Sequence, residues 1–170
     1  MEFDGLPLHI LLVHFTVVLL PLTALCTVAS AVWPFARRRL GIVTPLLAIA
    51  MMVLVPLTID AGQWLEDRVA ITPAIEHHAQ LANTLYPWTV ALFIAAVLQW
   101  GWFHFFDREK AKFRVSRRLR LIMMIVFSVI AVAVATGLII DVIQIGEAGA
   151  RAVWTNSFSP TPLPSHSPAP

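Results

Sequence analysis

Hydrophobic residues run along the chain in four long stretches that are separated by shorter polar segments. The stretches cover about residues 6–33, 40–59, 81–106 and 119–145. As a helix rising about 1.5 Å per residue, each is long enough to cross about 30 Å of hydrocarbon. Backbone groups find no water to bond inside a bilayer, so each stretch is expected to be helical. The pattern predicts an all-α membrane protein, an up-and-down bundle of four transmembrane helices.

The overall composition agrees with this pattern, and a change of composition near the C-terminal end indicates where the helical domain stops. Hydrophobic residues make up 58% of the 170-residue chain and charged residues 13%, whereas soluble domains are about half apolar and a quarter charged. One four-helix domain is predicted over residues 1–154. Residues 155–170 are rich in Pro and Ser and are predicted to form a disordered outer tail.

The positive charges are concentrated in two of the polar segments. Ten of the twelve Lys and Arg residues lie in segments 37–39 and 108–120. The positive-inside rule places both segments in the cytoplasm, and alternate crossing then places both termini and segment 60–80 outside. We expect a multi-pass protein of a bacterial inner membrane, with the lipid bilayer as its first partner. A redox protein or a second copy of the chain is a further candidate partner, and no nucleic acid is expected.

Several chemistries lack their sequence signals. The single cysteine, Cys26, cannot form an intrachain disulfide, and no CxxCH motif for c-type haem occurs. The sequence contains no phosphate-binding loop, HExxH motif or GxSxG motif. We therefore expect no independent catalytic activity.

Histidines are the candidate binding residues. Four of the six fall near the predicted outer ends of spans one and three, namely His9, His14, His77 and His78. Spans one and three lie diagonally opposite in an up-and-down bundle, so their imidazoles are able to meet across its axis, as in bundles that hold haem or metal. His14 lies deepest. We expect it to form an axial pair with His77 or His78 on a b-type haem or a metal, with His9 as the alternative.

Helix geometry restricts which of these histidines act together. His14 follows His9 by five positions and therefore points about 140° away from it. His9 instead shares a face with a stripe of hydroxyl residues that suits helix contact in lipid: Thr16, Thr23, Thr27 and Ser30. His77 and His78 also point in different directions on their helix, and the sequence leaves open which of them would act at the site. Plain interfacial histidines, hydrogen-bonded to water, remain the alternative interpretation for all four.

Other polar or small positions have simpler interpretations. Asp60 and Asp141 are expected to end spans two and four on the outer side as solvated helix ends, or alternatively to form a polar mouth near the histidines. His104 lies roughly 39 Å along a helix from His78 and is expected to be interfacial. Ala133 and Gly137 are expected to form a small-residue contact face.

Three segments, residues 6–22, 76–93 and 141–154, resemble a bacterial membrane family known as domain of unknown function 2231. The first two resemble its histidine-bearing motifs and the third its C-terminal signature. Ile10 and Thr16 depart from the pattern, since many members carry proline at those positions. The resemblance implies four transmembrane helices and no established activity. Some members are joined to Rieske-type iron–sulfur domains, which suggests redox work.

Three functional hypotheses follow from the sequence. The first is a small b-type haem-binding or metal-binding protein that acts as a redox accessory subunit. The second is a non-catalytic membrane scaffold whose histidines only line the interface. The third is a metal or proton permease, and it is the weakest because no span is expected to carry a buried carboxylate away from its end.

Overall fold

The computed structural model describes residues 1–106, 115–155, 157, 159 and 161. A short hairpin pairs β1 (Glu2–Phe3) with β2 (Leu6–Pro7) in antiparallel register, with Glu2 opposite Pro7. Helices make up most of the rest: α1 (Leu8–Val32), α2 (Pro34–Leu40), α3 (Val43–Glu66), α4 (Pro73–Ala82), α5 (Leu85–Phe105) and α6 (Arg117–Trp154).

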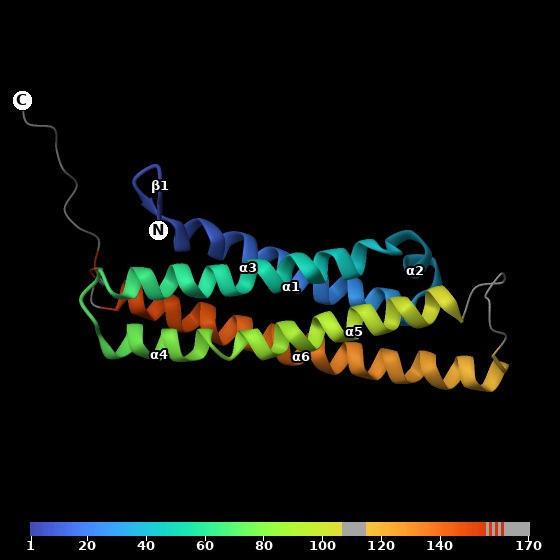
Figure 1. Cartoon of the computed structure of the whole chain (residues 1–170). Helices are drawn as coiled ribbons and strands as arrows, with labels where there is room; N and C mark the ends of the chain where they lie inside the picture. Colours follow the sequence, from blue (N-terminus) through green and yellow to red (C-terminus); the bar gives the residue numbers. More distant parts are fainter. Residues whose placement is uncertain (107–114, 156, 158, 160, 162–170) are drawn as a thin grey trace, which may run out of the picture.

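Four segments are long and apolar enough to cross a membrane: α1, α3, α4 together with α5, and α6 (Figure 1). This confirms the predicted all-α bundle of four membrane helices. The chain is an integral, multi-pass membrane protein. Segment 107–114, which holds four of the predicted cytoplasmic basic residues, lies outside the described residues, as does most of the predicted tail.

Three spans extend beyond their predicted hydrophobic stretches, and the third span begins at Pro73 instead of residue 81. The second was predicted to end at residue 59 and continues to Glu66, and the fourth was predicted to end at 145 and continues to Trp154. With 38 residues, α6 is about 57 Å long, well beyond the thickness of a hydrocarbon layer. Helical hydrogen bonds continue where the apolar pattern stops, so α3 and α6 extend beyond their apolar segments at the same end of the bundle.

The third span is broken near that same end. Helices α4 and α5 are separated by Asn83 and Thr84. Pro87 lies in the first turn of α5, and its missing N–H and its ring disfavour a regular helix at residue 83, four positions earlier. The carbonyl oxygen of Leu81 accepts a hydrogen bond from the Thr84 N–H at 2.9 Å and lies 2.7 Å from the Thr84 hydroxyl oxygen. His77 and His78 of the third span thus lie on a separate short helix.

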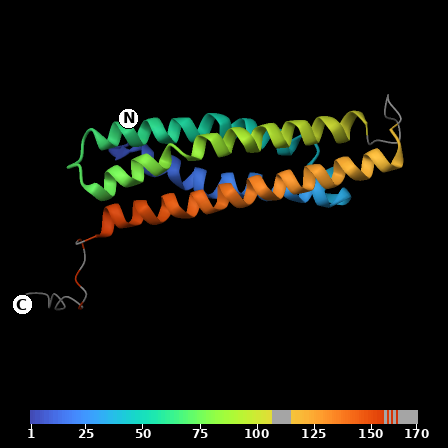
Figure 2. The same cartoon turned by 90° about the horizontal axis from the view of Figure 1, so that it is seen from below.

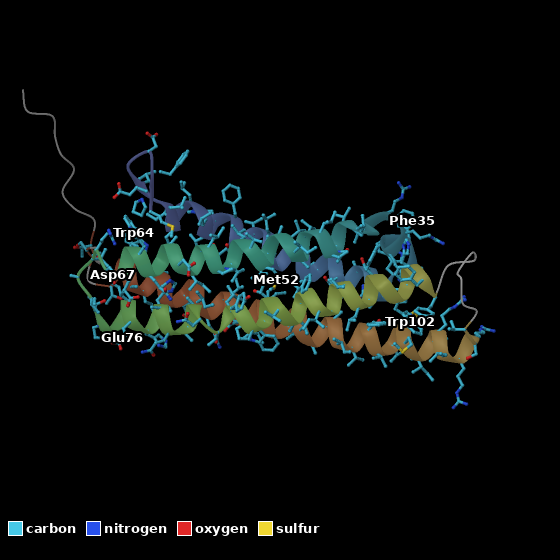
Figure 3. All side chains as sticks on the ribbon, in the orientation of Figure 1. Phe35, Met52, Trp64, Asp67, Glu76 and Trp102 are labelled. Atoms are coloured by element: carbon cyan, nitrogen blue, oxygen red, sulfur yellow. The ribbon has the colours of Figure 1, made fainter. Side chains whose placement is uncertain are left out.

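The arrangement of the helices confirms that spans one and three are diagonal. Helix α1 packs against α3 and α6, and α5 packs against the same two helices (Figures 1 and 2). Trp64, Asp67 and Glu76 lie at one end of the bundle, with Phe35 and Trp102 at the other (Figure 3). We call the first the histidine end, because His9 and His78 lie there, and the second the arginine end, because Arg37, Arg38 and Arg39 lie there.

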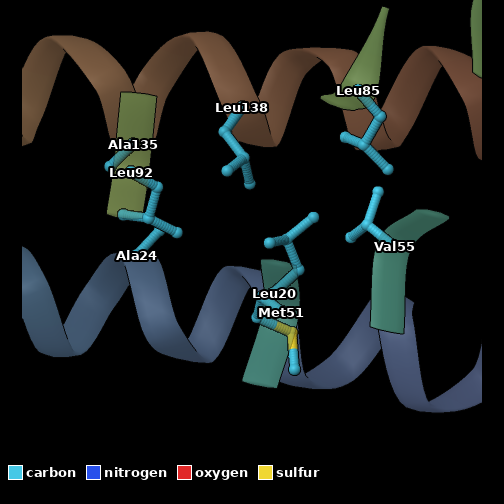
Figure 4. Close-up of a cluster of buried hydrophobic side chains, with 8 residues drawn as sticks. All are labelled: Leu20, Ala24, Met51, Val55, Leu85, Leu92, Ala135 and Leu138. Atoms are coloured by element: carbon cyan, nitrogen blue, oxygen red, sulfur yellow. The ribbon is translucent and has the colours of Figure 1, made fainter. Parts of the chain in front are cut away.

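The core is a column of apolar side chains to which every span contributes two residues (Figure 4). These are Leu20 and Ala24 of α1, Met51 and Val55 of α3, Leu85 and Leu92 of α5, and Ala135 and Leu138 of α6. Large apolar side chains also cover the outer surface, among them Phe15, Val18, Leu98 and Val129. An apolar exterior around a packed core is the pattern expected of helices that face lipid.

The predicted hydroxyl stripe of α1 is buried, and its two end residues, Thr16 and Ser30, contact hydroxyl groups of α3. The Thr16 and Thr58 hydroxyl oxygens are 2.9 Å apart, and those of Ser30 and Thr44 are 3.3 Å apart. The predicted Ala133–Gly137 face is wrong in part. Gly137 faces the ring of Trp88, whereas Ala133 is exposed; the buried alanines of α6 are Ala131, Ala135 and Ala148.

Burial reveals a repeat between the two halves that the local sequences do not show. Five buried positions of α1 have buried counterparts in α5, each 69 residues later: Thr16, Leu20, Thr23, Thr27 and Ser30 match Leu85, Thr89, Leu92, Ala96 and Gln99. His9 and His78 have the same spacing. Polar residues in one half correspond to apolar or larger ones in the other. The burial pattern is therefore repeated although the residue types are not.

Candidate functional site: a histidine pair across the bundle

His9 lies in the first turn of α1, and its ring reaches across to α3. Its Nδ1 is 2.9 Å from the carbonyl oxygen of Thr58. A carbonyl only accepts, so in the neutral ring Nδ1 carries the hydrogen and Nε2 keeps its lone pair. Gly62 makes the close approach possible, since a Cβ there would lie 3.0 Å from His9 Cε1. The hydrogen bond therefore fixes both the tautomer and the position of the ring.

His78 of α4 repeats this contact with α6. Its Nδ1 is 3.0 Å from the carbonyl oxygen of Ile145, and a Cβ at Gly149 would lie 3.0 Å from its Cε1. In each half the glycine comes four residues after the accepting carbonyl, at the position whose N–H bonds that same carbonyl in a helix. The missing side chain leaves the second lone pair of the oxygen open to the imidazole.

The two rings lie close together across the bundle. Their centroids are 6.4 Å apart, and their planes make an angle of 75°. Both rings are half-buried. One histidine from each half of the chain therefore lies beside the other at the histidine end of the core column.

The other candidate histidines lie elsewhere. His14 is exposed, and its Nδ1 bonds the carbonyl oxygen of Ile10 within its own helix. His77 is also exposed. His104 packs on Trp100, with ring centroids 5.2 Å apart, near the arginine end. The structure thus brings His78 together with His9, which sequence analysis gave as the alternative to His14.

The sequence contained a signal for this choice. Gly62 and Gly149 follow the ends of the second and fourth apolar stretches, one in each half of the chain. Glycine is unfavourable inside a helix by about 1 kcal/mol relative to alanine, so its presence there points to a close approach by another group. Matching the two positions to the two histidines requires knowing that the helices continue past residues 59 and 145.

Neither aspartate ends its span as predicted. Helix α3 continues past Asp60 to Glu66, but the Asp60 side chain is exposed, as the solvated interpretation expects. Asp141 does not end its span, because α6 continues to Trp154, and its side chain is buried with a relative exposure of 7%. The expectation that no span carries a buried carboxylate away from its end is therefore wrong.

The histidine pair suits a group that needs two protein ligands. Among the described residues no three His, Cys, Asp or Glu side chains lie together as a metal site. A metal–imidazole bond is about 2.0 Å, so two imidazoles that bind one ion in line have ring centroids about 6.4 Å apart. The two ring centroids are 6.4 Å apart, so the rings are close enough to share one ion where both Nε2 atoms are turned towards it.

Comparison with known proteins finds no matching family model, no matching curated protein and no matching solved structure. The resemblance to domain of unknown function 2231 stays a prediction that rests on the three segments given above. The function of the chain has to be inferred from its own residues and their geometry.

Proposed function

We propose that this membrane protein binds one b-type haem between His9 and His78 and acts as a redox accessory subunit. The observation that carries the proposal is the pair of imidazoles 6.4 Å apart, each held by a backbone carbonyl of the neighbouring helix. A bound haem would supply a one-electron iron couple.

The number of ligands favours haem over a bare ion. Structural zinc is almost always held by four protein ligands and catalytic zinc by three. Haem brings four porphyrin nitrogens of its own and needs at most two axial ligands from the protein. The site offers two imidazoles on helices that lie across the bundle from one another, which is the arrangement that haem-binding bundles use.

The residues around each ring would prepare it as a ligand. Donation from Nδ1 to a carbonyl holds the ring orientation and raises the basicity of Nε2, the nitrogen that remains free to bind. Thr58 and Ile145 supply these carbonyls. Below the pair, Val55 and Leu85 begin the apolar core, which would limit the access of water from that side.

The position of the pair also suits exchange of electrons with a partner outside the hydrocarbon layer. The basic residues at the opposite end support a cytoplasmic arginine end and an outer histidine end. On that orientation, the haem would lie at the outer surface of a bacterial inner membrane, within reach of a redox partner there.

A scaffold is the second candidate, and the same hydrogen bonds favour it. Each histidine links two helices, His9 joining α1 to α3 and His78 joining α4 to α6. In a scaffold these links would only lock the bundle, and nothing would bind between the rings.

Titration of the detergent-purified protein with haemin separates the two functions. We expect saturable binding of one haem per chain, weakened at least about tenfold by His9→Ala or His78→Ala, because each change removes an axial ligand. His14→Ala and His77→Ala are matched controls on the same helices and should bind as the wild type does. A wild-type protein that binds no haem, or variants that all bind equally, would contradict the proposal and leave the scaffold.

A further inference from the structure

The start of α6, at the arginine end, lies beyond the helix that packs beside it. Helix α5 ends at Phe105, whereas α6 extends further in the same direction (Figures 1 and 2). Phe103 of α5 packs against Phe127, with ring centroids 5.7 Å apart. Helix α6 begins at Arg117, which lies about 15 Å along the helix from Phe127. The first turns of α6 therefore extend past the end of α5.

An open pocket lies against these turns. Its volume is about 440 Å³, and it is lined by Val115 and by four residues of α6, namely Arg117, Arg120, Leu121 and Met124. The four follow one another at intervals of three, one and three residues, so they share a single face of the helix. Both arginines and Leu121 are exposed. This face therefore carries two cationic side chains in its first turn and two apolar side chains in its second.

The order of groups along this face matches the order of groups in a phospholipid. After Arg120 the helix has no charged residue until Asp141, so the arginines lie where the span leaves the hydrocarbon layer. Lipid phosphates lie at that level, and a guanidinium group binds phosphate oxygens through two parallel hydrogen bonds. Leu121 and Met124 lie one turn deeper, at the level where acyl chains begin. The pocket thus offers a charged surface and an apolar surface at the two depths that one lipid occupies.

The charge at the arginine end selects an anionic head group. Segments 37–39 and 107–120 of the sequence hold ten of the twelve Lys and Arg residues but only two of the ten Asp and Glu residues. Each basic residue near a membrane surface raises the affinity for anionic lipid about fivefold. A zwitterionic head group also carries an ammonium group, which this excess of positive charge would repel. An anionic phospholipid is therefore the occupant that fits the pocket.

We propose that the pocket at the start of α6 binds one anionic phospholipid, with the lipid phosphate held by Arg117 and Arg120 and an acyl chain lying along the two apolar side chains. The bound lipid would cover the part of α6 that extends past α5 and would fix its depth in the membrane. The pocket lies at the opposite end of the bundle from the histidine pair, so the proposal does not depend on haem binding.

Native mass spectrometry of the full chain, delipidated in detergent, tests the proposal. The protein is titrated with phosphatidylglycerol, which is anionic, or with phosphatidylcholine, which is zwitterionic, both with the same acyl chains. We expect the first phosphatidylglycerol to bind at least about fivefold more tightly than the first phosphatidylcholine. Arg117→Gln and Arg120→Gln should each lower the affinity for phosphatidylglycerol about fivefold. Equal affinity of the wild-type protein for the two lipids would overturn the proposal.

Arg118→Gln is the matched control for charge. It removes the same charge from the neighbouring position, but Arg118 points about 100° away from Arg117 and is not among the residues that line the pocket. We expect it to lower the affinity for phosphatidylglycerol clearly less than Arg117→Gln does. Equal losses in the two variants would show a general attraction between charges and would overturn a specific site.

The apolar half of the pocket distinguishes a lipid from a small phosphate compound. Leu121→Ala should weaken phosphatidylglycerol binding, because the acyl chain loses apolar contact. Ile122→Ala is its control, since Ile122 is also exposed but does not line the pocket. Glycerol 3-phosphate carries the phosphate without acyl chains and should not displace the lipid at equal concentration. Equal effects of the two alanine changes, or displacement by glycerol 3-phosphate, would overturn a lipid site.

These titrations contain no haem and use a different part of the molecule. Their failure would leave the haem proposal standing, and failure to bind haem would leave the lipid proposal standing.

Discussion

Each histidine of the pair is held by one carbonyl and one glycine on the neighbouring helix. The meeting of histidines from diagonal spans at one end of the bundle was predictable from the sequence, whereas bis-imidazole binding stays a prediction. Which two of the four histidines meet was not predictable. It depends on where α1 begins and on which face of α4 meets α6, and both are properties of packing that hydrophobic periodicity does not contain.

Replacing the glycine beside each ring by alanine should lower the stability of the protein more than the same change at a neighbouring glycine. Gly149→Ala places a Cβ 3.0 Å from His78 Cε1, whereas Gly146→Ala, one turn away on the same helix, meets nothing within 4 Å. Alanine favours the helix equally at both positions, by about 1 kcal/mol. We therefore expect Gly149→Ala to be less stable than Gly146→Ala by about 1–2 kcal/mol, the scale of overpacking.

Denaturant unfolding in detergent micelles measures this difference. Because Gly62 has the same relation to His9, Gly62→Ala should behave as Gly149→Ala does. Equal stability of Gly149→Ala and Gly146→Ala would mean that the ring of His78 does not lie against α6 as described.

At the scale of helices, the four spans were predictable and their ends were not. Hydropathy locates the apolar part of a helix. It does not locate the ends of α3 and α6, because both helices continue through more polar residues to Glu66 and Trp154. The break between α4 and α5 had a local signal in Pro87. Pro21 and Pro56 lie inside continuous helices, so a proline alone does not distinguish a break from a tolerated kink.

The packing of α5 against α6 depends on one large and one small residue. A Cβ at Gly137 would lie 2.2 Å from Trp88 Cη2, which no small adjustment relieves. We expect Gly137→Ala to lower the free energy of unfolding by about 1–3 kcal/mol. Gly101→Ala is the control, since nothing lies within 4 Å of its added Cβ.

A second change shows whether the clash with Trp88 is the cause. Replacing Trp88 by leucine in the Gly137→Ala protein should recover part of the lost stability, because the two residues are in contact and their effects are not additive. Independent, additive losses measured by thermal or denaturant unfolding would contradict the described contact.

For the whole molecule, the two halves repeat a burial pattern and a histidine–carbonyl–glycine contact without repeating their sequence. The alignment of buried positions became visible only in three dimensions, because Thr in one half corresponds to Leu or Ala in the other. The sequence predicts correctly that spans one and three are diagonal, since short connections leave few other arrangements. The facing histidines then follow from the repeat.

The orientation in the membrane is testable with single cysteines in a Cys26→Ser background. Thr155 follows α6 at the histidine end, and Arg38 lies in α2 at the arginine end. A membrane-impermeant thiol reagent applied to intact cells should label Thr155→Cys and not Arg38→Cys, because the basic residues favour the cytoplasm. Labelling with the reverse preference would contradict an outer histidine end.

The most direct test of the central claim is an absorption spectrum of the purified protein, expressed with haem supplied, before and after dithionite. We predict a Soret band that sharpens on reduction together with a distinct α band, the signature of a b-type haem with two imidazole ligands, and its loss in His9→Ala and His78→Ala. A folded wild-type protein with a featureless spectrum would contradict haem binding and make the histidine pair a structural link between helices.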